Sequence, residues 1–489
     1  MRAVLPFASL LLMGSSLAGC AVGPDYRPPL LAAPPVYLGG AAIANRPSPA
    51  AVEDARWWTG FGDPILTDLV GRALDRNLDI AQAVARVTQS RAGLRAANAA
   101  LLPSGSVSGS AAAAHQSLET PTGRIARTAP GFDRDGEIYE ANLGASWEID
   151  LFGGLRRGQE AARADYQASE AGVAAARLAV AAQTADTYIV IRGLQARIAV
   201  ADQQVTTQRK LVETIRLQYE KGVAAELQLR QAEGALAQVE ANVPVLTAGL
   251  DAAMNALDVV LGAQPGTYRA TLGTAVAIPV APAIADMGAP ADLLRRRPDL
   301  IIAERRLAAS NARIGVAVSE YFPKFSLSGL LGTATMTAGN VFTSGAAQAQ
   351  GVLGLRWRLF DFGRVDAQIA SAKGANAEAL AAYRLAVLRA SQDVEDAFSA
   401  LLNREVQAAV LARGETALAR AQGSSLAAYN GGVVSLIEVL DADSRLLATR
   451  DARAQAQTET ARAAVASFRA LGGGWQAPQQ RVAQVPARR

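Results

Sequence analysis

The sequence has few of the side chains that enzymes commonly use for metal binding or acid–base chemistry. It contains one histidine, His115, in a stretch rich in alanine and serine, and one cysteine, Cys20. A single cysteine excludes a disulfide bond within the chain. The glycines at 472–474 follow a helical stretch and lack the strand–loop–helix context of a phosphate-binding loop. We therefore predict no catalytic site, no metal site and no cofactor, and we predict that the chain is not an enzyme.

Net charge and long apolar runs are also scarce. A net charge of +4 over 489 residues is too small to indicate a nucleic-acid partner. Beyond the N-terminal leader, no uninterrupted apolar run reaches about 18 residues, so no membrane-spanning helix is expected. Proline is absent from Leu155 to Val243, where Ala, Gln, Arg, Glu and Leu dominate. These residues are strong helix formers, so the composition favours long helices.

The N-terminal leader is typical of an export signal. Arg2 supplies a short positive start, residues 5–12 are apolar, and Leu17-Ala18-Gly19-Cys20 resembles a bacterial lipoprotein cleavage site. We predict a signal peptide at 1–19 and lipidation, including palmitate, at Cys20. The alternative is a plain secretory signal with an incidental cysteine.

The residues after Cys20 indicate where the anchor lies. Ala21 follows the cysteine, whereas an Asp at this position tends to mark lipoproteins retained in the inner membrane, so the outer membrane is favoured. Several acyl chains give durable anchoring because each buried CH₂ contributes about 0.8 kcal/mol. Residues 20–55 are rich in Pro, Ala and Gly and are interpreted as a lipidated, extended N-terminal tether.

The remaining chain carries one unit twice. Residues 147–262 recur in degenerate form at 357–472 with an offset of 210, and an offset of 220 relates the stretches before them. The ten-residue difference lies between Pro103 and Trp147, where a loop is expected. This self-similarity predicts one duplicated architecture. The clearest matches are Trp147, Phe152 and Gly153 with Trp357, Phe362 and Gly363; Tyr219, Gly222 and Val223 with Tyr429, Gly432 and Val433; and Asp79, Ala83, Arg86 and Pro103 with Asp299, Ala303, Arg306 and Pro323.

Each unit is interpreted as helix, strand, loop, strand, long helix, turn and helix. The strand hairpins are expected at about 103–152 and about 323–362. The predicted boundaries are a first repeat at 56–262, an inter-repeat linker at 263–290, a second repeat at 291–472 and a C-terminal tail at 473–489.

A Tyr-x-x-Gly-Val sequence ends each long helix. Leu155–Tyr219 as one helix is about 100 Å long at 1.5 Å per residue, and Val365–Tyr429 predicts the same length. Glycine supplies the left-handed residue that lets a helix end and the chain reverse. Two antiparallel helical hairpins are therefore expected, with tips at 219–227 and 429–437. Helix periodicity alone leaves a coiled-coil scaffold as the alternative.

Alternating residues before each long helix predict β-strands. From Tyr139 to Leu151 every second residue is apolar, and Leu353–Leu359 repeats the pattern, whereas the strand after Pro103 is weaker. Membrane barrels use strands of about 9–11 residues, apolar toward lipid and polar toward the lumen, with aromatic residues at the interfaces. A soluble half-buried sheet is the alternative. The aromatic residues that fit these interfaces are Trp147, Phe152, Trp357, Phe360 and Phe362.

Two strand hairpins give too few strands for one chain to close a barrel. Four strands leave open edges, which lipid does not tolerate, and known membrane barrels have at least about eight strands. A membrane barrel therefore requires several chains, and three copies would supply twelve strands and twelve helices around one lumen.

Five short segments distributed along the chain carry a family resemblance. They are Cys20–Tyr26, Trp57–Pro64, Asn77–Val87, Arg296–Leu300 and Leu436–Ala442. Together they resemble the TolC-like outer-membrane efflux channels, in particular the NodT-type lipoproteins of resistance-nodulation-division efflux systems. The resemblance covers nearly the whole mature chain.

This resemblance implies a mainly α fold, internally duplicated, with a membrane β-barrel. Each chain supplies four transmembrane β-strands to a trimeric twelve-stranded barrel that continues into a long α-helical periplasmic tunnel. The implied setting is a homotrimer in outer-membrane lipid of a Gram-negative bacterium. The implied partners are a periplasmic adaptor (membrane fusion) protein and an inner-membrane pump.

The resemblance also implies a periplasmic gate. In this family acidic residues on the returning helix of the second hairpin close the tunnel, and the matching positions are Glu438 and Asp441, with Ile437 at an apolar constriction. Residues three apart share a helix face, so both carboxylates can point into a lumen. A trimer places six of them in a narrow ring that favours cations. A solvated helix face is the alternative.

Two further features concern the hairpins. Some relatives brace the gate with an Arg–Asp pair, and the corresponding residues here are Val434 and Gln228, so that lock is not expected. Arg230 or Arg445 would make different contacts. Simple hairpin geometry is the alternative for the candidate adaptor-docking tips, which are Gly222, Val223, Gly432 and Val433.

The predicted function is the outer-membrane exit channel of a tripartite efflux system, which passes drugs or small solutes from periplasm to exterior, with multidrug resistance as the phenotype. An exit duct for type I protein secretion is the nearest alternative. A periplasmic adaptor lipoprotein belongs to a different class; adaptors carry one hairpin flanked by small β-domains, whereas this chain has two. An envelope-anchored enzyme is disfavoured because enzymatic motifs are lacking.

Overall fold

The computed structural model describes residues 21–29, 35–46, 54–284, 289–292 and 296–473. The predicted signal peptide, Cys20 and all but the first residue of the predicted tail lie outside the described residues. The chain forms two compact units, and each takes parts of both repeats. Unit 1 comprises Met1–Pro29, Thr88–Ala168 and Glu304–Ala382, and unit 2 comprises Leu30–Val87, Ser169–Ala303 and Tyr383–Arg489.

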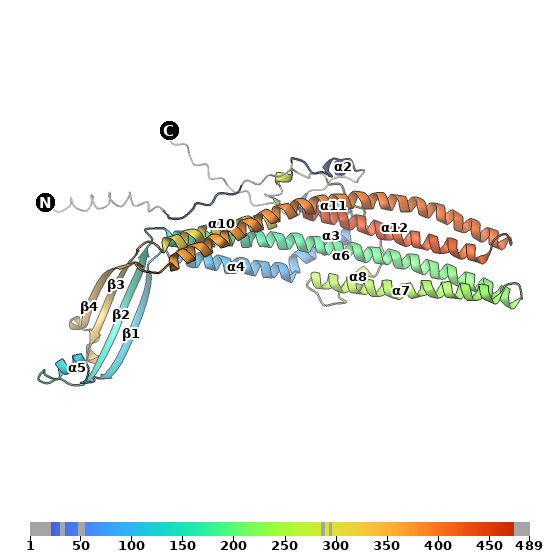
Figure 1. Ribbon diagram of the computed structural model, residues 1–489. Coiled ribbons are helices and arrows are strands. Elements are labelled where there is room, and N and C mark those ends of the chain that lie inside the picture. Colours follow the sequence, from blue (N-terminus) through green and yellow to red (C-terminus); the bar gives the residue numbers. More distant parts are fainter. Residues whose placement is uncertain (1–20, 30–34, 47–53, 285–288, 293–295, 474–489) are drawn as a thin grey trace. The chain divides into compact units, whose positions relative to one another are not determined.

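Unit 1 contains a four-stranded antiparallel sheet (Figure 1). Strand β2 of the first repeat pairs with β3 of the second, with Trp147 opposite Leu327. The weakly predicted strand after Pro103 forms because β2 pairs with it along its full length of 12 residues. The strands lie in the order β1-β2-β3-β4, with bounds Ser104–His115, Asp135–Ile149, Lys324–Thr335 and Ala347–Arg356.

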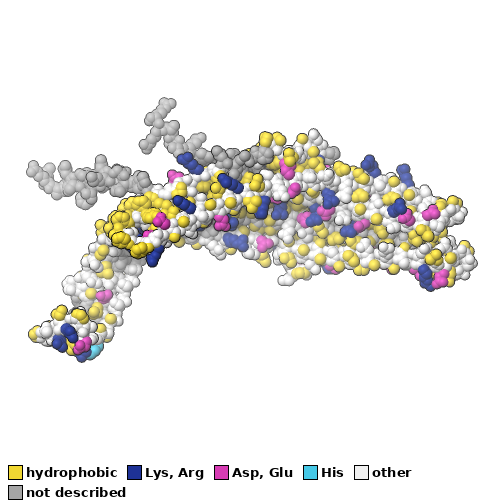
Figure 2. Space-filling view, viewed as in Figure 1, with side chains coloured by type: hydrophobic (Ala, Val, Ile, Leu, Met, Phe, Trp, Pro, Cys, Tyr) yellow, Lys and Arg dark blue, Asp and Glu magenta, His cyan; other side chains and the backbone are white. Residues whose placement is uncertain are grey.

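The sheet leaves apolar side chains uncovered. Figure 2 shows hydrophobic side chains gathered where the strands pass into the helices. A short helix, α5 (Pro121–Ala126), lies between β1 and β2, where the sequence shows no clear pattern. Exposed apolar side chains in such number mark a surface that contacts lipid or another protein. On the strands they include Val107, Leu143, Leu327, Leu331, Leu353 and Leu355.

The helices of unit 1 pack through small side chains. Unit 1 contains parts of α4 (Leu78–Ala99), α10 (Pro298–Ser319), α6 (Gly154–Glu220) and α11 (Arg364–Asn430). Ala164 of α6 forms a buried cluster with Ala308 and Ala309 of α10, on which Tyr26 packs. Alanine at this contact lets the two helix backbones approach closely.

Unit 2 contains the greater part of two helical hairpins, α6 with α7 and α11 with α12 (Figure 1). The returning helices are α7 (Glu226–Val260) and α12 (Leu436–Ala470). Both long helices have 67 residues and both returning helices have 35, so the duplication extends to element length. The predicted fold class, mainly helical, internally duplicated and with four strands per chain, is confirmed.

Each hairpin reverses at a glycine in the left-handed region. Gly222 and Gly432 both have φ of +74°, a conformation that residues with a Cβ adopt at a cost. The backbone NH of Val223 donates to Gln218 O at 2.8 Å, and that of Val433 donates to Ala428 O at 2.9 Å. These hydrogen bonds close a Schellman-type helix end, so the two turns share one geometry.

The core of unit 2 fastens the beginning of the first repeat to the long helices. Trp57 is fully buried and stacks on Phe468 of α12, with 5.3 Å between ring centroids. Asp63 caps α3 (Pro64–Arg76) and also accepts a hydrogen bond of 2.6 Å from the Tyr188 hydroxyl of α6. Burial raises the pKa of Tyr188 to about 12. The shorter elements are α2 (Gly40–Ala44), α8 (Arg269–Leu272) and the 3₁₀ helices at Asp54–Phe61 and Pro290–Asp292.

A buried guanidinium holds the start of the segment between the repeats. Arg192 of α6 is fully buried, and its Nη1 donates to Thr274 O at 2.7 Å. Gln195, one turn later, donates from Nε2 to Leu272 O at 2.6 Å. Because both backbone oxygens are satisfied by α6, this part of the segment is fixed to the first hairpin.

Helix α7 is long and apolar enough to cross a membrane by length and composition, with mean hydropathy 1.3 in its most apolar stretch. The sequence analysis expected no such helix because polar residues interrupt every apolar run. Its charged residues bind α6: Arg209 lies 2.7 Å from Glu240, and Arg216 lies 3.1 Å from Glu233. We interpret α7 as the returning half of a hairpin, since helices that pack on protein meet the same criterion.

Candidate functional site

The predicted gate residues lie at the start of α12, directly after the second hairpin turn. Leu436 and Val439 are buried, each with 1% exposure, and they set the face of α12 that packs inward. With 3.6 residues per turn, the positions between them point away from that face. Ile437 is 59% exposed, and Glu438 and Asp441 are exposed beside it. The structure therefore brings the three predicted gate residues together on one exposed face.

The two carboxylates of this face differ in their surroundings. Asp441 forms an exposed ion pair of 3.0 Å with Arg445, one turn further along α12. Glu438 lies in the first turn, where the positive end of the helix dipole favours an anion. An exposed ion pair of this kind contributes only a few tenths of a kcal/mol to stability. The Asp441 carboxylate can therefore leave Arg445 and interact with a passing ion.

The equivalent face of the first hairpin carries amides in place of carboxylates. An offset of 210 relates Glu438 and Asp441 to Gln228 and Gln231. Gln228 accepts a hydrogen bond of 3.0 Å from the backbone NH of Ala225 and thereby caps α7. Only the second repeat thus presents acidic residues at these two positions.

Arg230 and Arg445 are the arginines that could take the place of the Arg–Asp pair that some relatives use to hold the gate closed. Both form ion pairs with residues of their own helices. Arg230 binds Glu226 at 3.2 Å and Glu233 at 2.9 Å, both on its own helix. Arg445 binds Asp441, also on its own helix. Within the part of the chain that the structure describes, the ion pairs of both arginines therefore stay within one hairpin.

An apolar cluster joins the two hairpins near their turns. Next to this cluster, the Tyr429 hydroxyl donates a hydrogen bond of 3.2 Å to Gln218 Oε1, which ties the end of α11 to the end of α6. All four long helical segments therefore meet immediately beside the gate face. The buried members of the cluster are Leu211, Val212, Ile215, Leu229, Ala232, Leu436 and Val439.

Asp443 is a polar contact between the hairpins to which the sequence analysis gave no role. It is 3% exposed and accepts a hydrogen bond of 3.3 Å from Gln208 Nε2 of α6. Burial raises the pKa of Asp443. Its spacing of four residues from Val439 was the available signal, because it places Asp443 on the buried face of α12.

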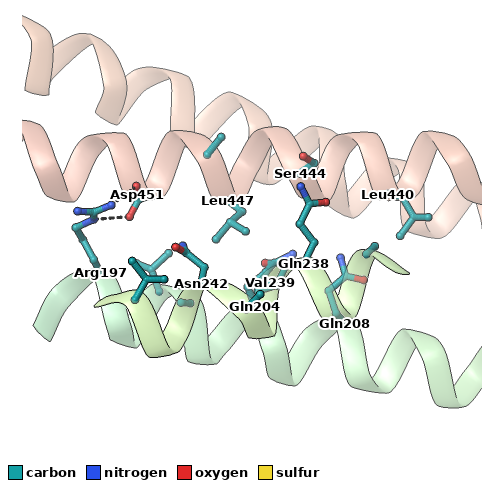
Figure 3. A pocket seen from close by; sticks show the side chains of 16 residues that line it. Arg197, Gln204, Gln208, Gln238, Val239, Asn242, Leu440, Ser444, Leu447 and Asp451 are labelled. Carbon is teal, nitrogen blue, oxygen red and sulfur yellow. Dashed lines mark hydrogen bonds and ion pairs between the residues drawn. The ribbon is translucent and has the colours of Figure 1, made fainter. Parts of the chain in front are cut away.

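A cavity of about 520 Å³ lies between α6, α7 and α12, further from the turns (Figure 3). At one end Arg197 and Asp451 form an ion pair of 2.6 Å. Gln204 and Gln208 on its wall are nearly fully buried, and Gln204 Nε2 and Gln208 Oε1 have no hydrogen-bond partner within the described chain. The hairpin junction thus contains unsatisfied amide groups beside Asp443.

The predicted tip residues project from the two turns. Val223 is 76% exposed and Val433 is 80% exposed. Apart from the glycine and its two chain neighbours, no heavy atom of the described chain lies within 4 Å of a Cβ placed on Gly222 or Gly432. Two apolar side chains on turns of the same geometry are therefore exposed to contact by another protein.

The described part of the chain holds no group of three or more His, Cys, Asp or Glu side chains that could bind a metal ion. His115 pairs with Asp135 at 2.7 Å at the end of the sheet.

Comparisons with known proteins agree with this architecture. A family described as outer membrane efflux protein matches residues 69–263 and 289–473. Nodulation protein T of Rhizobium leguminosarum bv. trifolii is 30% identical over 97% of each chain. The pyoverdine export outer membrane protein OpmQ of Pseudomonas putida is 32% identical, covering 91% of this chain and 94% of its own.

The likeness extends to a solved structure. The outer-membrane channel OprN is 33% identical, with a TM-score of 0.85 over 93% of this chain and 100% of its own. The family is described as outer membrane efflux protein, and OpmQ and OprN are named as an export outer membrane protein and an outer-membrane channel. These matches confirm the resemblance stated above and the prediction that the chain is not an enzyme.

Proposed function

The chain belongs to the outer membrane efflux protein family, and on that premise we propose that it is the lipid-anchored exit channel of a tripartite efflux system. Its general role as an outer-membrane efflux channel follows from the family. In the proposed assembly three copies form a twelve-stranded barrel in the outer membrane and a helical tunnel below it. Drugs or small solutes pass through it passively, and an inner-membrane pump supplies the energy through a periplasmic adaptor.

The observation that carries the proposal is the exposed acidic face of α12. Ile437, Glu438 and Asp441 stand next to the turn of the second hairpin, on the side of α12 opposite to buried Leu436 and Val439. In a threefold assembly this face supplies three isoleucines and six carboxylates to one ring. A narrow ring of carboxylates concentrates cations and repels anions.

The N-terminal segment supports anchoring at the membrane. Ala21 lies against Gly153, where an added Cβ would come within 2.6 Å of its Cα. Val22 N donates to Phe152 O at 3.0 Å. Cys20 directly precedes Ala21 in the sequence, and Phe152 follows the end of β2. Acyl chains on Cys20 would therefore begin close to the point where a membrane strand leaves the lipid.

The turns are the proposed contact with the adaptor. Val223 and Val433 are exposed apolar side chains on two turns of equal geometry. A photocrosslinking residue at Val433 in the native bacterium tests this contact, with identification of the product by mass spectrometry. We expect a periplasmic adaptor (membrane fusion) protein; products that contain only copies of this chain would refute the contact. Photocrosslinking from exposed Val276, which lies between the repeats, is the control.

Channel formation tests the proposed function itself. Purified, detergent-solubilised protein is examined for its oligomeric mass and then for conductance in planar bilayers. The account predicts a trimer and discrete openings of uniform size. A monomer that remains folded by circular dichroism and produces no openings would refute the exit channel.

A further inference from the structure

The cavity between α6, α7 and α12 contains polar groups that the fold leaves without partners (Figure 3). Gln204 and Gln208 lie about one turn apart on α6 and are 6% and 3% exposed. Gln204 Nε2 and Gln208 Oε1 are buried, and neither forms a hydrogen bond with any part of the chain that the structure describes. Burial of an amide group without a partner costs stability. The cavity therefore holds one donor and one acceptor that a bound molecule can satisfy.

The orientation of the Gln208 amide is set by α12. Its Nε2 donates to Asp443 Oδ2 at 3.3 Å, so the carbonyl oxygen is the group that remains unused. A glutamine amide donates only from its nitrogen and accepts only at its oxygen. The two unused groups therefore differ in kind, because Gln204 offers an N–H donor whereas Gln208 offers an acceptor.

The second repeat does not carry these amides. An offset of 210 relates Gln204 and Gln208 to Gly414 and Leu418 of α11. Both long helices nevertheless have 67 residues. The duplicated architecture thus forms with a glycine and a leucine at the two positions, so the glutamines of α6 are not a requirement of the hairpin itself.

The cavity has the size and the wall of a small-molecule site. Its volume of about 520 Å³ lies within the range of about 300–1,000 Å³ that is typical of ligand pockets. Gln238 and Asn242 of α7 also line it and are exposed, so the cavity opens to solvent. The rest of the wall includes the apolar side chains of Val200, Val239, Leu440 and Leu447.

The charged side chains of the wall neutralise each other. Arg197 Nε and Nη2 donate to the two carboxylate oxygens of Asp451 at 2.6 and 3.0 Å. A bidentate pair of this kind satisfies both charged groups. The wall therefore offers hydrogen bonds and apolar surface without a net charge, which favours a neutral ligand.

We propose that this cavity binds a small neutral amide that carries an apolar group. The carbonyl oxygen of the ligand accepts from Gln204 Nε2, and its N–H group donates to Gln208 Oε1. A carboxylate lacks the proton that Gln208 requires, and an amidinium group lacks the acceptor that Gln204 requires. The apolar group of the ligand packs on the valines and leucines of the wall.

A molecule in this cavity contacts both hairpins. Residues of α12 line it at intervals of three and four, so they share one helix face. They are Leu440, Ser444, Leu447 and Asp451. Leu440 directly precedes Asp441 of the gate face. Movement of α12 away from α6 and α7 breaks contacts with the ligand, so binding favours the arrangement in which the hairpins are packed together. Binding itself does not depend on the exit channel, whereas this effect on the gate rests on the proposed function.

Three probes of nearly the same shape test the chemistry of the site. Benzamide is neutral, benzoate is its anionic counterpart and benzamidinium is its cationic counterpart. Their affinity for the purified protein in detergent is measured by ligand-observed NMR, with empty micelles as the blank. We expect benzamide to bind about tenfold more tightly than either charged probe, the difference expected for one hydrogen bond. Equal affinity for all three probes, or tighter binding of a charged probe, would overturn the proposed class of ligand.

Gln204→Met tests the role of the unused donor, because it removes the amide and keeps the length of the side chain. Benzamide should bind about tenfold more weakly to this variant. Without ligand, the unfolding temperature should stay the same or rise, because an apolar group replaces a buried amide nitrogen without a partner. Gln203→Met, at the exposed neighbouring glutamine of α6, is the control. A lower unfolding temperature with unchanged benzamide binding would show that the amide is structural and that the cavity holds water only.

Conductance separates this inference from the proposed function. In planar bilayers benzamide should lower the open probability of wild-type channels and leave Gln204→Met channels unaffected. Binding without any change in open probability would contradict the effect on the gate. Protein that conducts but binds no benzamide refutes only this inference, whereas folded protein that binds benzamide and produces no openings refutes the exit channel and retains the site.

Discussion

Gln208 Nε2 of α6 donates a hydrogen bond of 3.3 Å to Asp443 Oδ2 of α12, and this contact links the first hairpin to the second. The counterpart of Asp443 in the first repeat is Glu233, which binds Arg216 and Arg230 at the surface. Burial raises the pKa of Asp443, whereas hydrogen bonds from Arg230 and Arg216 lower the pKa of Glu233. Equivalent positions of the two repeats therefore hold two carboxyls whose pKa values shift in opposite directions, upward for Asp443 and downward for Glu233.

The fold around Asp443 should become more stable as the pH falls, because burial raises the pKa of this carboxyl. A carboxyl whose pKa is raised by folding contributes stability that is complete below its ordinary pKa of about 4 and is lost as the pH rises through the raised pKa. The protonated form can also donate to Gln208 Oε1, which lacks a partner within the described chain. The groups acting on Asp443 are Gln422 of α11 and Arg450, which itself binds Glu415 of α11.

Asp443→Asn tests this contact because the amide imitates the neutral acid. We expect a gain of about 1 kcal/mol at neutral pH, the typical net value of one hydrogen bond, and a flatter dependence of stability on pH above about 4. Thermal unfolding followed by circular dichroism from pH 4 to 8 measures both. Asp202→Asn, at an exposed carboxyl of α6, is the control. Loss of stability at all pH values would contradict the expected effect.

The glycine of the second turn should be intolerant of a side chain. Gly432 has φ of +74°, so Gly432→Ala should destabilise the turn by about 1 kcal/mol. Gly431→Ala is the matched control, because the neighbouring glycine is not among those with positive φ. Hydrogen exchange of the first turn of α12 reports the difference. Equal exchange in the two variants would show that the left-handed conformation is not required.

Lipidation of Cys20 has a direct chemical readout. Mass spectrometry of the mature N-terminal peptide should find acyl chains on Cys20 in the wild type and none in Cys20→Ala. Ala21→Asp is the control, since it retains the cysteine and should keep the acyl chains while shifting the protein toward the inner membrane. An unmodified cysteine in the wild type would support the plain secretory signal.

Local sequence signals identified most of the architecture. A glycine that follows a long helix commonly supplies the left-handed residue at which the helix ends. The turns at Gly222 and Gly432 could therefore be predicted from the sequence. Strand β1 was harder, because its serines, glycines and alanines have little preference of their own and its order comes from pairing with β2. The helix α5 was not predicted because residues 112–136 have no periodicity.

The sequence predicted one part of the candidate site, the gate residues of α12, but neither the contact between the hairpins nor the cavity beside it. Helical periodicity predicts that Ile437, Glu438 and Asp441 share an exposed face. The family resemblance, in turn, suggests that this face is a gate. The Gln208–Asp443 contact joins residues that are 235 positions apart, and no local pattern reports such a distance. The cavity beside it depends on the packing of three helices and is visible only in three dimensions.

The central claim is that the acidic face of α12 forms the narrowest part of a channel. The most direct measurement is the reversal potential in a KCl gradient for single channels of the wild type and of Glu438→Gln/Asp441→Asn. The double variant Glu220→Gln/Glu226→Gln is the matched control; it removes the same charge from exposed acids at the first hairpin turn. The account predicts a cation-selective wild type, a gate variant with little selectivity and larger conductance, and a control that resembles the wild type. Selectivity that survives in the gate variant, or that is lost equally in the control, would contradict it.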